Sequence, residues 1–85
     1  MRDIDALFTA GNKAQREKLV ENGHKDSWDS MSFEAVASLI YEESEEVHEE
    51  LIKRGVNIKL LRLECADLAN ACHFMIGLCD KELTN

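Results

Sequence analysis

Apolar residues recur along this chain with the three-and-four spacing of helices that pack on other helices. The clearest run lies near the C-terminus and consists of Ile58, Leu61, Cys65, Leu68, Cys72, Met75 and Cys79. These seven positions, called the α-seam below, predict a long helix over residues 58–83. The chain has no proline and only four glycines, which agrees with helix throughout.

Two further helices are predicted upstream. Residues 1–22 carry a ragged apolar stripe and form the first, and a polar loop over residues 23–32 follows it. The second helix covers residues 33–54, with Ser32 as its N-cap and Gly55 just beyond its last turn. The expected fold is all-α: an antiparallel helical hairpin preceded by an N-terminal helix.

The length of 85 residues predicts a single domain over residues 1–85. A domain this small buries a modest fraction of its surface when it is alone. We therefore expect a second copy to complete the core, giving a helical bundle as a homodimer or tetramer.

The balance of 17 acidic against 10 basic residues gives a formal charge of −7. Phosphate backbones need clustered lysine and arginine, so a nucleic-acid polymer is not the expected partner. No apolar run is long enough to span a bilayer, and the acidic N-terminus does not resemble a secretory signal. No membrane partner is therefore expected, and the expected location is the cytoplasm.

Three cysteines, Cys65, Cys72 and Cys79, are spaced seven apart. On a helix the Cα atoms of successive cysteines would then lie roughly 10 Å apart, which is too far for a disulfide. We interpret them as small core hydrophobes, with a redox or catalytic thiol as the alternative.

The acidic run over residues 42–50 is the most informative part of the chain. Three of its acids fall opposite the apolar stripe, toward solvent: Glu42, Glu45 and Glu49. Three others share one flank of the stripe: Glu43, Glu46 and Glu50. On the next helix Glu64 and Asp67 lie one turn apart beside the α-seam. Packing of the hairpin would therefore bring Glu43 and Glu46 to face these two acids.

Carboxylates that meet at the edge of a core repel one another and lose hydration. A divalent cation offsets both costs, and an all-oxygen ligand set suits Mg²⁺ or Mn²⁺ better than zinc. The spacing leaves open a second interpretation, in which these acids are boundary residues paired with nearby cations: Lys53, Arg54, Lys59 or Arg62.

Glu43-x-x-Glu46, then 17 residues, then Glu64-x-x-Asp67 resembles the ExxE…ExxD motif of the MazG-like, all-α nucleoside triphosphate pyrophosphatases. The upstream segment His24-Lys25-x-x-Trp28 is similar to the short MazG-like proteins of phages and bacteria. The resemblance covers roughly residues 12 to 82.

The resemblance implies that Glu43, Glu46, Glu64 and Asp67 hold Mg²⁺, or Mn²⁺ in its place. The cation would bind a nucleoside triphosphate and activate a water that attacks the α-phosphate, releasing a monophosphate and pyrophosphate. Glu46 or Glu50 would accept the proton of that water.

Four residues are candidates for substrate binding: His24, Lys25, Trp28 and Asn70. Lys25 is the first candidate for a phosphate contact, while His24 would contact base or phosphate, or lie exposed in its loop. Trp28 would stack on a base or cap the apolar edge of the bundle. Asn70, one turn after Asp67, would hydrogen-bond sugar or phosphate.

Two other functions fit the same residues. A non-catalytic acidic helical module would bind a protein partner, and its acids would have no need to converge. An enzyme of the same broad fold acting on a phosphoribosyl-nucleotide would show little activity on ordinary triphosphates.

Overall fold

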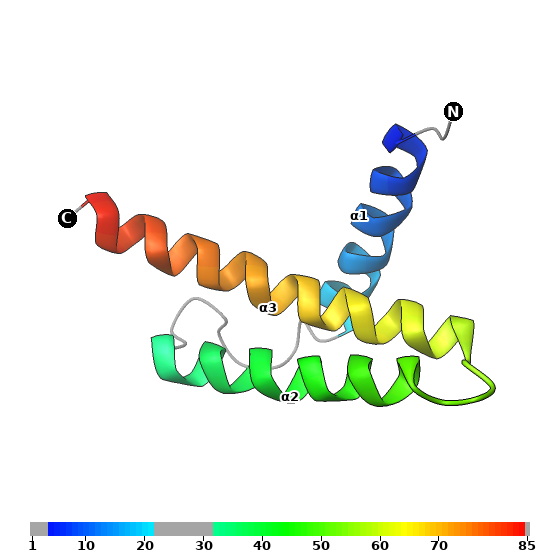
Figure 1. The fold of residues 1–85 in the computed structure, drawn as a ribbon. Coiled ribbons are helices and arrows are strands. Elements are labelled where there is room, and N and C mark those ends of the chain that lie inside the picture. Colours follow the sequence, from blue (N-terminus) through cyan, green and yellow to red (C-terminus); the bar gives the residue numbers. More distant parts are fainter. Residues whose placement is uncertain (1–3, 22–31, 85) are drawn as a thin grey trace.

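Three helices make up residues 4–21 and 32–84, which the computed structural model describes (Figure 1). They are α1 (Ile4–Glu21), α2 (Phe33–Leu51) and α3 (Ile58–Thr84). No strand occurs in these two ranges, so the all-helical prediction is confirmed. Nearly all of the predicted loop, including His24, Lys25 and Trp28, lies outside the described residues.

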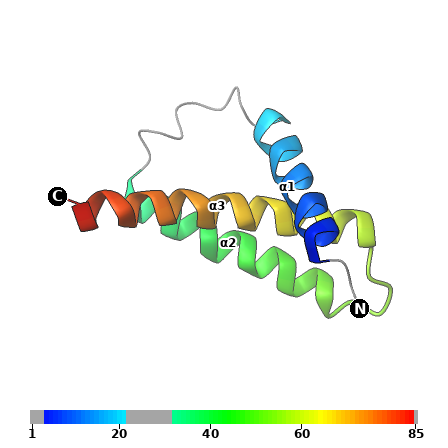
Figure 2. The ribbon, with the colours of Figure 1, turned by 90° about the horizontal axis from the view of Figure 1, so that it is seen from above.

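The helices α2 and α3 lie side by side and antiparallel, as both views show (Figures 1 and 2). The helix α1 packs across α3, and its N-terminal end projects away from the hairpin (Figure 1). The central element is therefore α3, which contacts both of the other helices. No helix in the described ranges is both long and apolar enough to cross a membrane.

The core of the described chain is thin and consists of small side chains. Its fully buried apolar residues are Ala14, Val36, Ala66 and Ala71. Large apolar side chains stay outside it, among them Phe8, which is 69% exposed, and Leu83, which is 82% exposed. Burying such surface is the main favourable contribution to folding, so much of that contribution is left unused within one chain.

The α-seam is not the most buried stripe of α3. Ile58, Cys65 and Cys79 are exposed, and the other seam residues are half-buried. The prediction that all three cysteines are core residues is therefore wrong for Cys65 and Cys79, although all three are unbridged as expected. The reason is that α1 and α2 pack against a different face, where Ala66, Asn70 and Ala71 lie.

The start of α2 is the predicted one, and its end is earlier than predicted. Ser32 caps the helix, because its hydroxyl accepts a hydrogen bond from Ala35 N–H at 3.1 Å. The helix ends at Leu51 with Ile52 as C-cap, so Gly55 does not occupy the predicted position after the last turn.

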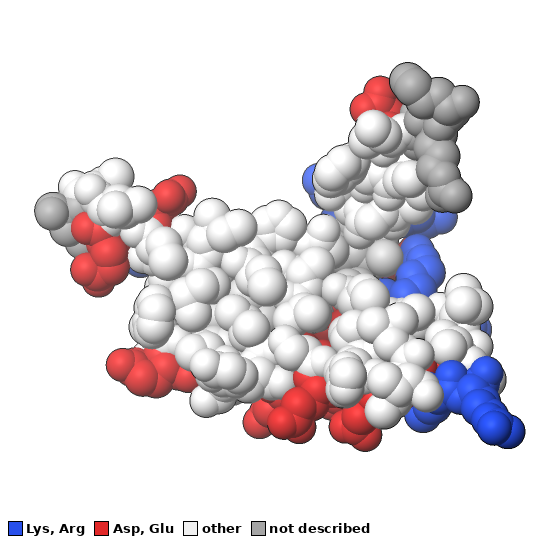
Figure 3. Space-filling view, viewed as in Figure 1, with Lys and Arg blue, Asp and Glu red and all other residues white. Residues whose placement is uncertain are grey.

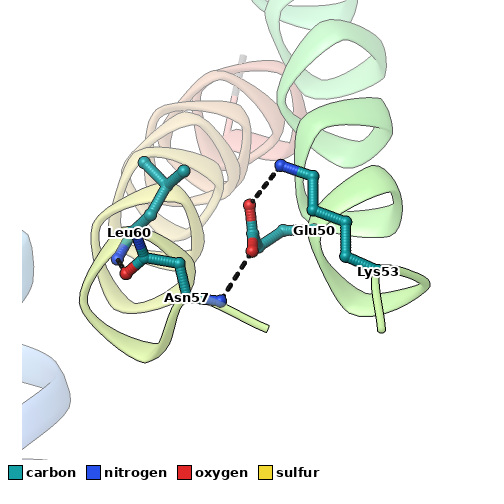
Figure 4. Close-up of polar contacts among 4 residues, drawn as sticks. All are labelled: Glu50, Lys53, Asn57 and Leu60. Atoms are coloured by element: carbon teal, nitrogen blue, oxygen red, sulfur yellow. Dashed lines mark hydrogen bonds and ion pairs between the residues drawn. The ribbon is translucent and has the colours of Figure 1, made fainter. Parts of the chain in front are cut away.

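A buried carboxylate holds the turn between α2 and α3 (Figure 4). Glu50, only 1% exposed, accepts hydrogen bonds from Asn57 N–H at 2.8 Å and from Lys53 Nζ at 2.9 Å. Asn57 in turn caps α3, because its side-chain oxygen accepts from Leu60 N–H at 3.0 Å. These contacts fix where α3 begins relative to α2.

Candidate functional site

The four motif acids come from two facing helices: Glu43 and Glu46 from α2, and Glu64 and Asp67 from α3. Acids on the opposite helix raise the pKa values of two of them. Asp67 helps to raise the pKa of Glu43, and Glu46 helps to raise that of Glu64. Glu43, Glu64 and Asp67 are half-buried, whereas Glu46 is exposed.

Glu43 is the most perturbed of these acids. Burial, and then the charges of Asp67 and Glu46, raise its pKa from 4.5 to about 7. Its Oε2 atom is buried and has no hydrogen-bond partner among the described residues. Such an atom loses its hydration without compensation, and a bound cation would supply the missing partner.

The pKa of Glu64 is raised as well. Burial is the largest cause, followed by the negative charges of Glu46 and Glu50, while Lys53 acts in the opposite direction. Two of the four acids are thus disfavoured in their charged form, and both lie where the helices meet. Repulsion of this kind is often found at functional sites.

A lysine that the sequence did not single out lies beside one of the acids, Asp67. Lys18 Nζ of α1 is 3.6 Å from Asp67 Oδ2, with side-chain exposures of 12% and 24%. Its position in the sequence could have indicated this contact, because Lys18 lies four residues after Ala14 and so on the face of α1 that packs on α3. The pairing proposed for the acids, with Lys53, Arg54, Lys59 or Arg62, is replaced at Asp67 by Lys18. Arg62 instead pairs with Glu17 at 3.2 Å.

Glu50 has a different environment from the other candidate proton acceptor. The Asn57 N–H and the Lys53 ammonium lower its pKa and engage both of its carboxylate oxygens. A base with a lowered pKa and no accessible oxygen is poorly placed to take a proton from water. The geometry thus gives Glu50 a structural role, while Glu46, the other candidate, is exposed.

Asn70 is also engaged elsewhere. It is 5% exposed, donates to Gln15 O at 3.1 Å and accepts from Gln15 Nε2 at 3.1 Å. Gln15 Nε2 also lies 2.6 Å from His73 Nδ1. The expected contact of Asn70 with sugar or phosphate does not fit this geometry, because both ends of its amide already tie α1 to α3.

The predicted solvent-facing acids of α2 are exposed, as expected: Glu42, Glu45 and Glu49. In Figure 3 the acidic side chains of the hairpin that are visible on this face lie mainly along its α2 edge. Basic side chains gather at the α2–α3 turn and where α1 meets α3. Of the motif acids only Glu46 is exposed like the three solvent-facing acids, whereas Glu43, Glu64 and Asp67 are half-buried.

The donor chemistry of the motif acids fits a hard divalent cation, since all of their donors are carboxylate oxygens and one is buried without a partner. Within residues 4–21 and 32–84, no three His, Cys, Asp or Glu side chains are already arranged to hold one metal ion. Binding would therefore require these carboxylates to change rotamer and draw together.

Comparison with protein-family models, with curated proteins and with solved structures finds no match for this chain. The MazG-like resemblance accordingly rests on the motif residues themselves.

Proposed function

We propose that this protein is a Mg²⁺-dependent pyrophosphohydrolase that cleaves nucleoside triphosphates to monophosphates and pyrophosphate. The observation that supports it most is the environment of Glu43, where the two motif helices meet. Glu43 has a pKa raised to about 7 beside Asp67 and Glu46, with one buried oxygen lacking a partner among the described residues. A surface that only attracts a basic protein gains nothing from forcing acids together.

In this proposal Glu43, Glu46, Glu64 and Asp67 hold Mg²⁺, and Mn²⁺ can replace it. The bound cation supplies charge neutralisation at the triphosphate and a more acidic water. Glu46, exposed beside the other acids, accepts a proton from the attacking water.

Other parts of the chain position these groups. Glu50 holds the α2–α3 turn and thereby sets how the two motif helices face each other. The substrate contacts proposed for His24, Lys25 and Trp28 belong to the segment that leads into α2.

We also propose that the working form is a homodimer or tetramer. The α-seam is only partly buried, and residues such as Phe8 and Leu83 are exposed. A second copy of the chain would cover this apolar surface. Light scattering after size-exclusion chromatography should give a mass at least twice that of the 9.7 kDa chain. A monomer at micromolar concentration would contradict this part of the proposal.

Pyrophosphate release from a panel of NTPs and dNTPs, with a phosphoribosyl-nucleotide added, tests the activity. Release should require Mg²⁺ or Mn²⁺. Glu43→Gln and Asp67→Asn should each lower it by about 100-fold or more, the scale of losing one electrostatic stabiliser. Glu45→Gln, the same charge change at an exposed position of α2, is the matched control and should be near wild type.

A non-catalytic acidic module is the second candidate, favoured by the exposed acids Glu42, Glu45 and Glu49 along α2. It predicts no release from any nucleotide, while Glu43→Gln and Asp67→Asn fold normally and are more stable than wild type. Release from the phosphoribosyl-nucleotide alone would instead reassign the substrate.

A further inference from the structure

Lys18 differs from the other described lysines in its surroundings. It lies in the last turn of α1, and its side chain is only 12% exposed. By contrast Lys53, which pairs with Glu50, has a side chain that is 57% exposed. An ammonium group taken out of water is costly unless negative charge lies beside it, and here Asp67, one of the motif acids, supplies such a charge.

The contact between Lys18 and Asp67 is long for an ion pair. The 3.6 Å separation of Nζ and Oδ2 compares with 2.9 Å between Lys53 and Glu50. Charge-assisted hydrogen bonds are typically about 2.7–2.9 Å long. Lys18 Nζ and Asp67 Oδ2 are therefore farther apart than in a short charge-assisted hydrogen bond.

The net charge of the proposed site calls for a positively charged side chain. Four carboxylates around one divalent ion leave the site negative, which repels a triphosphate. Lys18 brings a positive charge to Asp67, one of those carboxylates, from a third helix. A lysine ammonium is a common phosphate ligand in proteins.

We propose that Lys18 binds the polyphosphate of the substrate. This inference rests on the proposed function. With a divalent cation held by the carboxylates, Lys18 would no longer need Asp67 as its partner, and its ammonium would contact a phosphate oxygen of the nucleotide or of the pyrophosphate product. Lys18 thus pairs with Asp67 in the metal-free protein and would bind phosphate in the metal-bound protein.

Calorimetric titration tests this with two probes, Mg²⁺ alone and inorganic pyrophosphate at fixed Mg²⁺. The variants are Lys18→Met, which removes the charge, and Lys18→Arg, which keeps it. Lys13→Met is the matched control, since it removes the same charge from an exposed position of α1. Circular dichroism confirms folding, and Lys18→Gln replaces Lys18→Met should the latter not fold.

Lys18→Met should weaken pyrophosphate binding by about 10-fold to 100-fold, the range for losing a charged hydrogen bond. Lys18→Arg should restore most of that affinity, and Lys13→Met should leave it unchanged. Mg²⁺ alone should bind Lys18→Met at least as tightly as wild type, because a competitor for Asp67 is gone.

Unchanged pyrophosphate affinity in Lys18→Met would overturn the inference, as would an equal loss in Lys13→Met or a loss of Mg²⁺ binding itself. If wild type meanwhile still hydrolyses nucleotides, only the inference fails. If wild type neither binds pyrophosphate with Mg²⁺ nor hydrolyses any nucleotide, the proposed function fails with it.

Discussion

Replacing Glu43 by glutamine should stabilise the metal-free protein at alkaline pH. The pKa of Glu43 rises from 4.5 to about 7 in the folded state. Between these values the folded protein binds more protons than the unfolded chain, so the free energy of unfolding falls as pH rises. The full shift corresponds to about 3 kcal/mol, which partial exposure of the carboxyl group reduces to about 1–2 kcal/mol.

The substitution removes the charge and keeps the hydrogen bonding of the protonated acid. A side-chain hydrogen bond with Glu46 is among the causes of the raised pKa of Glu43, and an amide at this position still carries a donor for that carboxylate. Glu64, whose pKa is also raised, keeps a pH dependence of the same sign in the variant. Glu50 does not interfere, because a lowered pKa acts only below its ordinary value of 4.5.

Urea unfolding followed by circular dichroism in EDTA, near pH 5 and near pH 8, measures the effect. Glu43→Gln should exceed wild type by about 1–2 kcal/mol near pH 8 and match it near pH 5. Glu45→Gln removes the same charge from an exposed position and should change little. The reasoning is refuted by an equal gain at both pH values, or by the same gain in the control.

Three other predictions concern metal and the two structural contacts. Magnesium should raise the melting temperature of wild type and leave that of Glu43→Gln nearly unchanged; equal shifts would argue against a metal site. Asn70→Ala should lower the free energy of unfolding by about 1–3 kcal/mol, because Gln15 loses both of its hydrogen bonds to Asn70. Hydrogen exchange in α1 should accelerate. Unchanged exchange would mean that other contacts hold the helix. Glu50→Ala should lower the melting temperature more than Glu49→Ala, because only Glu50 holds the α2–α3 turn; equal effects in thermal scans would contradict that role.

The helices could be predicted because apolar spacing and capping are local properties of the sequence. Ser32 needs only the backbone three residues ahead to act as an N-cap. The buried face of α3 could not be predicted in this way. Large apolar residues define the α-seam, but the alanines at positions 66 and 71 define where the other helices approach. Small side chains give a weak hydrophobic signal and yet decide how closely helices pack.

In the candidate site, the positions of the acids on each helix could be predicted, but their contacts with other elements could not. The stripe on each helix placed Glu43 and Asp67 on facing flanks, and the contribution of Asp67 to the raised pKa of Glu43 agrees with that placement. Lys18 was missed because its contact with Asp67 depends on how α1 crosses α3. The hydrogen bonds of Glu50 could not be predicted because they depend on where α2 ends, and helix ends are the least certain part of a periodic pattern.

The hairpin turn has a consequence for the order in which this chain folds. Glu50 and Asn57 are seven residues apart, whereas Gln15 and Asn70, which fasten α1 to α3, are 55 residues apart. Closing a short loop costs less entropy and happens sooner than closing a long one. We therefore expect the two motif helices to pair first, so that their carboxylates already oppose one another before α1 docks and delivers its lysine.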